Sequence, residues 1–493
     1  MSSRFVIDLT LDSSDNEDAG EASSTIPNTP SLVRSPTESP RKIKIAMTAQ
    51  KLTACEEELA SQTERIASME LTKESKSPER SKLDLSSPEV LALSPFRNVK
   101  RLPDIIYAEQ KIGLNKATHR VIMEADIQYN SPGSPDILIE NEVDKQWAPP
   151  YNFIYINDYL LDTNMRPDHT QKNDYLTVKK GCSCRDGFCD AKTCDCRKIH
   201  SKLAPDYYQN FPQDQFAYKS DGLLHKEILE QEDTPIWECN KDCTCAGDCE
   251  NYVVSKKRKV GLTIFKHAKK GWCVKLAEDV KAGQFIETYT GELITAADAN
   301  KRNLVYSKLN NTYVMDLTPF HVKWHVHAMP YLRKTGQTKD QYVEKKLRER
   351  NFKGTIEERL NERSNILDEL VEEEEKKCED DKLLSIDGTL FGNVTRYLAH
   401  SCEPNLVRHM VYTYERDIRR PLVAYFASKD IKAGEEITMH YEGLSDHNFE
   451  GPHSAQMSEF VERLENMKCY CGTPSCSQLV FGGRREQAAK TRM

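Results

Sequence analysis

Short runs of apolar and β-branched residues, separated by turns that contain glycine, follow one another through the second half of the chain. This spacing predicts a mostly-β domain of small strands rather than alternating strands and helices. No Gly-x-Gly-x-x-Gly sequence follows any of the runs, which argues against a dinucleotide-binding fold. The predicted strands cover residues 261–265, 285–289, 312–317, 422–427 and 436–441, and an entry strand is predicted over 149–156.

Residues 1–100 have a different pattern, since Ser, Glu, Asp and Pro dominate and no continuous apolar period appears. This composition predicts a disordered regulatory tail. At 6–11, β-branched residues followed by acids suit addition of a strand to a partner's sheet edge and resemble a SUMO-interacting motif. The alternative is an incidental apolar patch. Apolar residues at every seventh position over 45–70 predict a short coiled coil, or a lone helix that only a partner orders.

A charge-dense stretch interrupts the predicted strands between residues 319 and 382. Leucine and isoleucine recur among its charges, which indicates helix, and it ends in acidic blocks at 372–375 and 379–381. Such a block is usually a solvated face. The alternative is an acidic surface that holds a basic tail near a functional site.

Composition and charge narrow the class of protein. The 493-residue chain has a formal net charge of −8, which argues against a DNA-coating protein and is compatible with a cationic substrate. The N-terminus has no apolar signal core, and no run of about 18 apolar residues predicts a membrane span. We therefore expect a reduced, intracellular protein that does not enter a membrane.

Nine cysteines between residues 182 and 249 form two tight clusters, Cys-x-Cys-x4-Cys-x4-Cys-x-Cys and Cys-x3-Cys-x-Cys-x3-Cys. Disulfides are the alternative interpretation, but Cys-x-Cys pairs bridge poorly and the expected compartment is reducing. Thiolates at this spacing suit zinc. Three zinc ions need about twelve ligand positions in tetrahedral sites, and six terminal plus three bridging thiolates supply them. The predicted ligands are Cys182, Cys184, Cys189, Cys194, Cys196, Cys239, Cys243, Cys245 and Cys249.

Four further stretches follow the cysteines in a definite order. They are Lys270-Gly-Trp-Cys-Val274, Tyr289-Thr-Gly-Glu292, Arg396-Tyr-Leu-Ala-His-Ser-Cys-Glu-Pro-Asn405 and Glu435-Glu-Ile-Thr-Met-His-Tyr441, with Cys469-x-Cys471-x4-Cys476 behind them. With the nine cysteines in front, this order resembles the pre-SET, SET and post-SET regions of histone lysine methyltransferases. Shorter words, including Asn141-Glu-Val-Asp144 and Ile386-Asp-Gly388, resemble the suppressor-of-variegation (heterochromatin) branch.

The resemblance implies a division of the chain into regions. A SET fold of short β-sheets would occupy residues 258–318 and 383–443, with the charged insert at 319–382 between its two parts. The remaining regions implied are an N-terminal flank at 101–179, a pre-SET zinc cluster at 180–257 and a post-SET segment at 465–482.

The resemblance also implies a cofactor, S-adenosylmethionine, and the residues around it. Tyr441 would be the catalytic tyrosine, and Tyr313 a second channel tyrosine that also contacts the cofactor. The cofactor-binding residues implied are Gly271, Trp272, Cys273, Tyr313, Ala399 and His400, largely through main-chain groups. Cys402 would complete a post-SET zinc site with Cys469, Cys471 and Cys476. Met439 would occupy the position whose bulk controls the number of methyl groups.

Three positions depart from the family pattern: Cys273 replaces a usual Gly, Ala399 a usual Asn and His440 a usual Asp. The implied activity is methyl transfer to histone H3, at lysine-9, with di- or trimethylation and a role in heterochromatin and gene silencing. A catalytically weak SET scaffold in chromatin silencing is the alternative. The implied partners are the histone H3 tail and chromatin, in the nucleus. Lys256-Lys-Arg-Lys259 resembles a nuclear localisation signal, or is a solvated edge.

Overall fold

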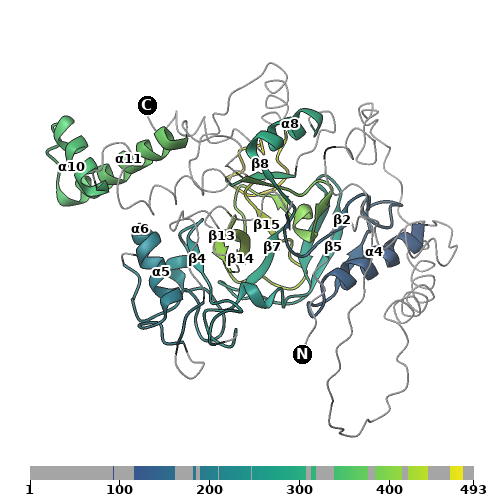
Figure 1. Cartoon of the computed structure of the whole chain (residues 1–493). Helices are drawn as coiled ribbons and strands as arrows, with labels where there is room; N and C mark the ends of the chain where they lie inside the picture. Colours follow the sequence, from purple (N-terminus) through teal and green to yellow (C-terminus); the bar gives the residue numbers. More distant parts are fainter. Residues whose placement is uncertain are drawn as a thin grey trace, which may run out of the picture. The chain divides into compact units, whose positions relative to one another are not determined.

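The computed structural model describes residues 93, 116–161, 181–184, 189–208, 210–245, 247–306, 313–317, 338–375, 384–413, 420–441 and 467–480, and all structural statements concern these residues. Figure 1 labels many of their helices and strands. The SUMO-interacting motif at 6–11, the coiled coil at 45–70 and all of the predicted tail except residue 93 lie outside them. No helix in the described part of the chain is long and apolar enough to cross a membrane.

A four-stranded sheet with the order β4-β13-β14-β7 forms the middle of the core. It joins strands from distant parts of the chain: β13 pairs in parallel with β4 and antiparallel with β14, which in turn pairs with β7. Nearly every residue of these strands is buried on both faces, in agreement with their continuous apolar runs. The bounds are β4 Pro235–Trp237, β7 Phe285–Tyr289, β13 Leu406–Tyr412 and β14 Leu422–Ala427.

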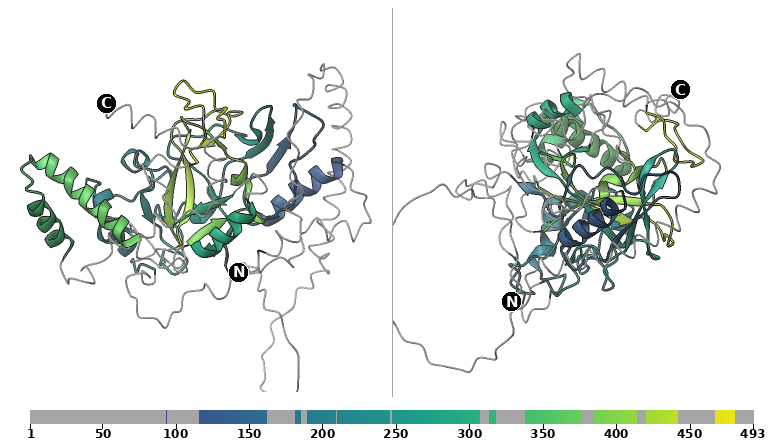
Figure 2. Two further views of the ribbon diagram at one scale, coloured as in Figure 1. Left: turned by 90° about the horizontal axis from the view of Figure 1, so that it is seen from above. Right: turned by 90° about the vertical axis from the view of Figure 1, so that its right-hand side faces the viewer.

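Two other sheets complete the strand framework, one of order β1-β5-β6 and one of order β3-β8-β10-β9. Helix α4 packs against β1 and β2, and α8 packs against β8 and β10 (Figures 1 and 2). Two short pairs, β2 with β11 and β12 with β15, join loops rather than building large sheets. The bounds are α4 Lys116–Asn130, β1 Ile137–Glu140, β2 Ile154–Tyr155, β3 Leu160–Leu161, β5 Leu262–His267, β6 Gly271–Leu276, β8 Glu292–Thr295, α8 Ala296–Tyr306, β9 Val314–Asp316, β10 Leu384–Asp387, β11 Phe391–Gly392, the 3₁₀ helix η6 Val394–Tyr397, β12 Ala399–His400 and β15 Thr438–Met439.

The region of the nine cysteines is tied directly into this framework. Strand β4 runs straight into the second cysteine group, and helix α5 packs against β4. His200 of α5 makes the contact specific, because its Nε2 accepts the Trp237 backbone N–H at 2.9 Å. The local bounds are α5 Asp195–Leu203, α6 Pro205–Tyr208, α7 Lys226–Leu229 and the 3₁₀ helix η3 Val254–Lys256.

The charge-dense stretch contains two helices, α10 (Lys339–Glu349) and α11 (Ile356–Glu375). Thr338 caps α10 in a capping box with Gln341. Val343, Leu347, Ile366 and Leu367 form the buried contact between the two helices. Charged pairs such as Arg359 with Glu344 lie on the exposed surface. The helical character agrees with the pattern of apolar residues, while the domain boundaries drawn from the sequence remain predictions.

The predicted mostly-β fold is confirmed, and each predicted strand overlaps an observed one. The observed strands are often shorter: the runs 436–441 and 149–156 contain only β15 and β2. Several charged residues within the apolar core form ion pairs. Arg302 contacts both Glu292 and Asp387, and Arg258 contacts Glu287.

Candidate functional site

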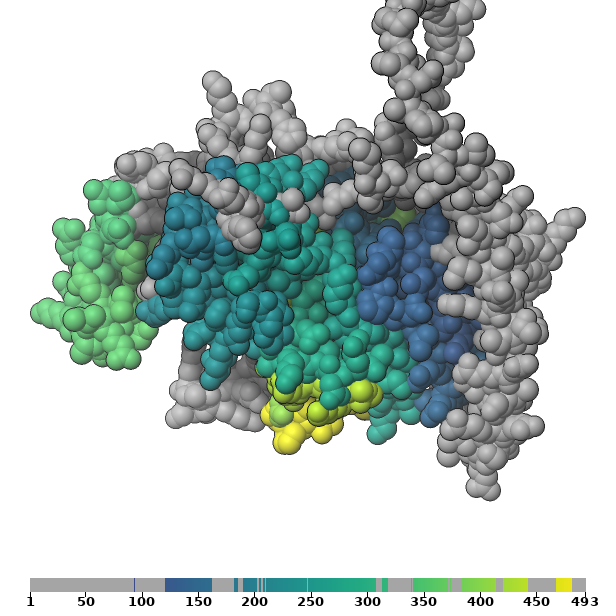
Figure 3. Space-filling model, turned by 90° about the horizontal axis from the view of Figure 1, so that it is seen from below, coloured from purple at the N-terminus to yellow at the C-terminus, as the bar shows by residue number. Residues whose placement is uncertain are grey.

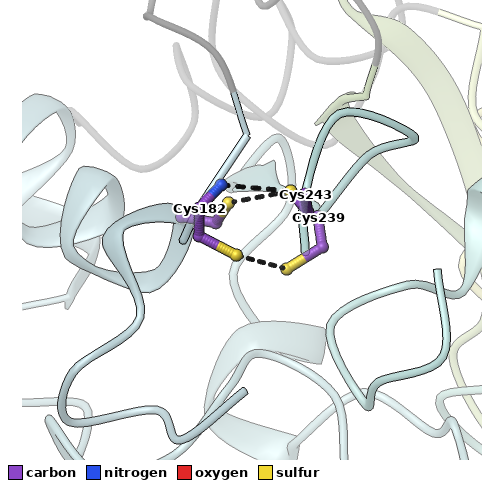
Figure 4. A group of neighbouring side chains, drawn as sticks. Cys182, Cys239 and Cys243 are labelled. Carbon is purple, nitrogen blue, oxygen red and sulfur yellow. Dashed lines mark hydrogen bonds between the residues drawn. The ribbon is translucent and has the colours of Figure 1, made fainter. Parts of the chain in front are cut away.

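The nine cysteines between residues 182 and 249 converge on one place. The sulfurs of Cys182, Cys189 and Cys239 form a triangle with edges of 3.7, 3.8 and 4.0 Å. Tetrahedral zinc with Zn–S bonds of about 2.3 Å separates its sulfurs by about 3.8 Å. The sulfurs therefore already have the spacing of a zinc–thiolate cluster. Figure 4 shows the side chains of Cys182, Cys239 and Cys243 turned toward one another.

Three groups of four sulfurs, each group lying within 4.8 Å, overlap at the corners of this triangle. Cys196 and Cys243 join two corners of the triangle, and their own sulfurs are 3.6 Å apart. The groups are Cys182, Cys196, Cys239 and Cys243; Cys182, Cys184, Cys189 and Cys194; and Cys182, Cys189, Cys239 and Cys245. Cys249, half-buried, packs against the same cluster.

Backbone N–H groups also contact one sulfur of the cluster. The N–H groups of Cys182 and Asn240 donate to Cys243 Sγ at 3.3 and 3.1 Å. A contact with Cys196 lowers the pKa of Cys194 to about 4, whereas burial raises the pKa of Cys189. So many buried thiols within a few ångströms of one another require cations to ionise together, and the donor set fits zinc.

A second group of four sulfurs lies at the other end of the described chain. Cys402, Cys469, Cys471 and Cys476 have sulfurs within 4.8 Å, and Cys402 Sγ is 3.9 Å from Cys469 Sγ. We call this set the C-terminal quartet. Lys269, at the turn between β5 and β6, lies over the ring of Tyr470. The quartet thus anchors the C-terminal segment, yellow in Figure 3, beside the β5–β6 hairpin.

Two segments that the resemblance assigned to the site meet through the pair β12–β15. Ala399 lies opposite Thr438, His400 lies opposite Met439, and Ser401 N–H donates to Met439 O at 2.9 Å. Asn405 strengthens the contact, because its amide donates to Glu436 O and accepts from Thr438 N–H, each at 2.8 Å.

The hydroxyl of Tyr441 points back toward this junction and donates to Leu398 O at 3.0 Å. Although 38% of the residue is exposed, burial raises the pKa of the Tyr441 hydroxyl, and the neighbouring Tyr313 and Cys273 act in the same direction. The phenol is therefore neutral near pH 7 and is a hydrogen-bond donor rather than a base.

Tyr313 is held at the site by an arginine. The guanidinium of Arg396 lies between two rings, 4.3 Å from the centre of Tyr313 and 3.8 Å from that of Phe153. Its Nη1 donates to Gly388 O at 3.0 Å, and Tyr289 Oη donates to Tyr313 O at 2.6 Å. Arg396 thus holds the ring of Tyr313 from the side of the fold.

The stretch Gly271-Trp272-Cys273 opens β6, which packs against η6 beside the site. Gly271 has a φ of 83°, a conformation that favours glycine, and the space beside its Cα is open. Cys273 is fully buried and its Sγ donates to Gly271 O at 3.6 Å, away from both sulfur groups. An open backbone turn of this kind lets a ligand approach main-chain groups closely.

Sequence reasoning overlooked several contacts of this site. The sequence offered no reason to assign Asn405 a function. Leu398 takes part through its backbone carbonyl oxygen, a contact that its residue type does not indicate. Leu479 is half-buried, and its backbone carbonyl accepts from Ser477 Oγ at 2.7 Å.

Comparison with known proteins gives two family matches. The model of the SET domain matches residues 271–442, and that of the Pre-SET motif matches residues 130–252. The residues that the two models match include all nine clustered cysteines and both segments of the site, around His400 and around Tyr441.

Curated relatives align with about two thirds of this chain. A histone-lysine N-methyltransferase, H3 lysine-9 specific, of Cryptococcus neoformans var. grubii is 31% identical over 342 residues, which cover 67% of this chain and 16% of the relative. Histone-lysine N-methyltransferase SUV39H1 of Xenopus laevis is 26% identical over 356 residues, 70% of this chain and 63% of the relative. The chain thus spans less than two thirds of these two relatives.

Among solved structures, the Neurospora SET domain protein DIM-5, a histone lysine methyltransferase, is 26% identical with a TM-score of 0.43, over 65% of this chain and 100% of that one. The two family models together account for the cysteine cluster and for both segments of the site. The chain therefore belongs to the SET-domain family, in the group that carries a Pre-SET motif and whose relatives include H3 lysine-9-specific histone methyltransferases.

Proposed function

We propose that this protein is a lysine methyltransferase that uses S-adenosylmethionine and acts on histone H3, at lysine-9. The observation that carries the proposal is the meeting of Tyr441, Tyr313 and the β12–β15 junction beside the open Gly271 turn. The names of the relatives supply the substrate class.

Tyr441 and Tyr313 would carry the chemistry on the protein side. A neutral Tyr441 hydroxyl orients the substrate amine and stabilises charge near the reacting carbon, while both rings exclude water. Exclusion of water lowers the pKa of a lysine amine, so the nucleophile forms without a dedicated strong base. Alignment of the amine for in-line attack then supplies much of the rate.

The cofactor site proposed is the turn at Gly271, Trp272 and Cys273 together with Tyr313, Ala399 and His400. When bound, S-adenosylmethionine supplies a methyl group activated by a sulfonium. The open space beside the Gly271 Cα would let the cofactor approach the backbone closely, and β12 would present main-chain groups of Ala399 and His400. Ala399 in place of asparagine removes a side-chain amide, so we expect main-chain contacts to dominate cofactor binding.

We propose four zinc ions in the described part of the chain. Three belong to the nine-cysteine cluster, with Cys182, Cys189 and Cys239 as the bridging thiolates, because these are the sulfurs that form the shared triangle. The fourth belongs to the C-terminal quartet. There zinc would fold the last segment beside the site and so couple metal binding to activity.

We propose the histone H3 tail and chromatin as partners, the nucleus as location, the region boundaries of the sequence, and di- or trimethylation. The SUMO-interacting motif at 6–11 and the coiled coil at 45–70 stay predictions outside the described residues.

Methyl transfer to H3 peptides, followed by mass spectrometry with zinc loaded, tests the proposed function. We expect Tyr441→Phe to lower kcat by about 100-fold, because loss of the hydroxyl misplaces the amine. Tyr425→Phe, a fully buried tyrosine of β14, is the matched control and should retain activity. Equal and negligible transfer by the wild type and Tyr441→Phe would contradict the enzyme and favour the alternative, a SET scaffold in chromatin silencing.

A further inference from the structure

The imidazole of His400 lies between a proposed zinc ligand and the proposed catalytic residue. Its Nε2 is 3.6 Å from Cys402 Sγ, and its Nδ1 is 3.3 Å from the backbone nitrogen of Tyr441. The residue is 5% exposed, so the imidazole ring itself is buried. One buried ring thus contacts the C-terminal quartet on one edge and the site on the other.

These two contacts determine which ring nitrogen carries the proton. The Tyr441 backbone N–H is a donor, so His400 Nδ1 offers its lone pair. A neutral imidazole then carries its proton on Nε2, the atom that faces Cys402 Sγ. A zinc-bound thiolate accepts such a bond, and donors around ligand sulfurs commonly tune metal affinity. Ser477 N–H donates to the same sulfur at 3.4 Å.

The surroundings of His400 hold the ring in this orientation. The ring of His440 packs edge-on against it, with centroids 4.7 Å apart, and the ring of Tyr441 lies at 5.4 Å. Tyr441 is therefore held from the 398–402 segment at two points, its backbone N–H by His400 and its hydroxyl by Leu398 O.

We propose that the side chain of His400 is a positioning residue that connects the zinc site of the C-terminal quartet to Tyr441. Nε2–H stabilises the Cys402 thiolate, and Nδ1 fixes the backbone of Tyr441, so that zinc in the quartet orders the tyrosine. The inference rests on the proposed function for the role of Tyr441, but the contact with Cys402 is independent of it.

Two substitutions of His400 test the contacts of its two ring nitrogens separately. Asn places a side-chain acceptor near the position of Nδ1 but cannot reach Cys402, whereas Gln places a donor near Nε2 and loses the acceptor near Tyr441. His225→Asn, at the start of α7, is the matched control. Zinc release to a chromophoric chelator and steady-state methyl transfer are measured on the full chain. Cys476→Ser identifies the release phase that belongs to the quartet.

We expect His400→Asn to release the quartet zinc about 10- to 100-fold more readily than the wild type. His400→Gln should retain that zinc, yet lower kcat about 10-fold or more with little change in KM for S-adenosylmethionine, because Tyr441 loses its anchor. Release from His400→Asn at the wild-type rate would overturn the contact with Cys402. An unchanged kcat in His400→Gln would overturn the coupling to Tyr441.

The two readouts also separate this inference from the proposed function. A wild-type protein that transfers no methyl group would contradict the proposed function, while zinc release would still decide the contact between His400 and Cys402. Loss of zinc from His225→Asn as well would assign the effect to general destabilisation and overturn the inference.

Discussion

At the scale of single residues, Met439 is the residue that we propose limits how many methyl groups the substrate amine can receive. It lies on β15 opposite His400, is half-buried and packs against the core. Its thioether is flexible and has no hydroxyl, so it resembles Phe more than Tyr in what it offers to a methylated amine.

We predict that Met439→Tyr shifts the products of methyl transfer toward monomethyl lysine, because the hydroxyl and the larger ring reduce the space around the amine. Met439→Phe, the control, should retain the wild-type distribution. Mass spectrometry of the peptide products measures both. Identical distributions for the three proteins would show that residue 439 does not control the degree of methylation.

A second single residue links stability to pH. His409 of β13 is 0% exposed, and burial lowers its pKa to about 4. The unfolded chain, with an ordinary histidine pKa of about 6.5, binds this proton more readily, so stability is lost as pH falls from about 6.5 to 4.

We therefore predict that the wild type loses about 2 kcal/mol more stability between pH 7 and pH 5 than His409→Gln, which does not titrate. Urea unfolding of both proteins at the two pH values measures the difference, and comparison with the variant cancels the contribution of the cysteines. Equal losses would mean that His409 is charged in the folded protein at pH 5.

At the scale of elements, the contact between α5 and β4 explains how the cysteine cluster supports the SET fold. His200 of α5 accepts from Trp237 N–H and donates to Arg197 O, at 2.9 and 3.0 Å. Trp237 in turn stacks on Tyr412 of β13, with ring centroids 5.0 Å apart. The buried side chain of Trp237 thereby joins the region of the cysteine cluster to the central sheet.

We predict that His200→Ala lowers the free energy of unfolding by about 2 kcal/mol, because it leaves the buried Trp237 N–H without its acceptor. Zinc should also leave the nine-cysteine cluster faster in this variant. Chemical denaturation and chelator competition test both effects, with His225→Ala as the control on a neighbouring helix. A stability equal to that of the wild type would show that α5 is held by its other contacts.

At the scale of the whole molecule, the C-terminal quartet closes a loop of the chain that begins in the middle of the SET region. Cys402 supplies one sulfur, and Cys469, Cys471 and Cys476 supply the others from a segment more than 60 residues later. Zinc bound by sulfurs so far apart in the chain would restrict the unfolded chain and order the folded one.

We predict that a chelator abolishes methyl transfer and lowers Tm, and that added zinc restores both. Cys402→Ser should lose one zinc equivalent, whereas Cys273→Ser, whose thiol lies away from both sulfur groups, should retain all of them. Metal analysis of the purified variants measures this. Full zinc content in Cys402→Ser would exclude Cys402 as a ligand.

Local patterns were enough to predict part of this protein. Apolar runs placed the strands, because a buried strand needs a continuous apolar segment, and cysteine spacing predicted the sulfur groups, because metal ligands must be close in the chain or in space. The ordered stretches around Tyr289, His400 and Tyr441 led to the family, which the family matches confirmed.

Tertiary structure alone decided how these pieces meet. The sheet order β4-β13-β14-β7 depends on pairings between distant strands, which apolar runs do not specify. The triangle of Cys182, Cys189 and Cys239 and the bond from Tyr441 to Leu398 O are likewise distances between atoms far apart in the chain. A residue type shows what a side chain can do, and only packing shows which partner it reaches.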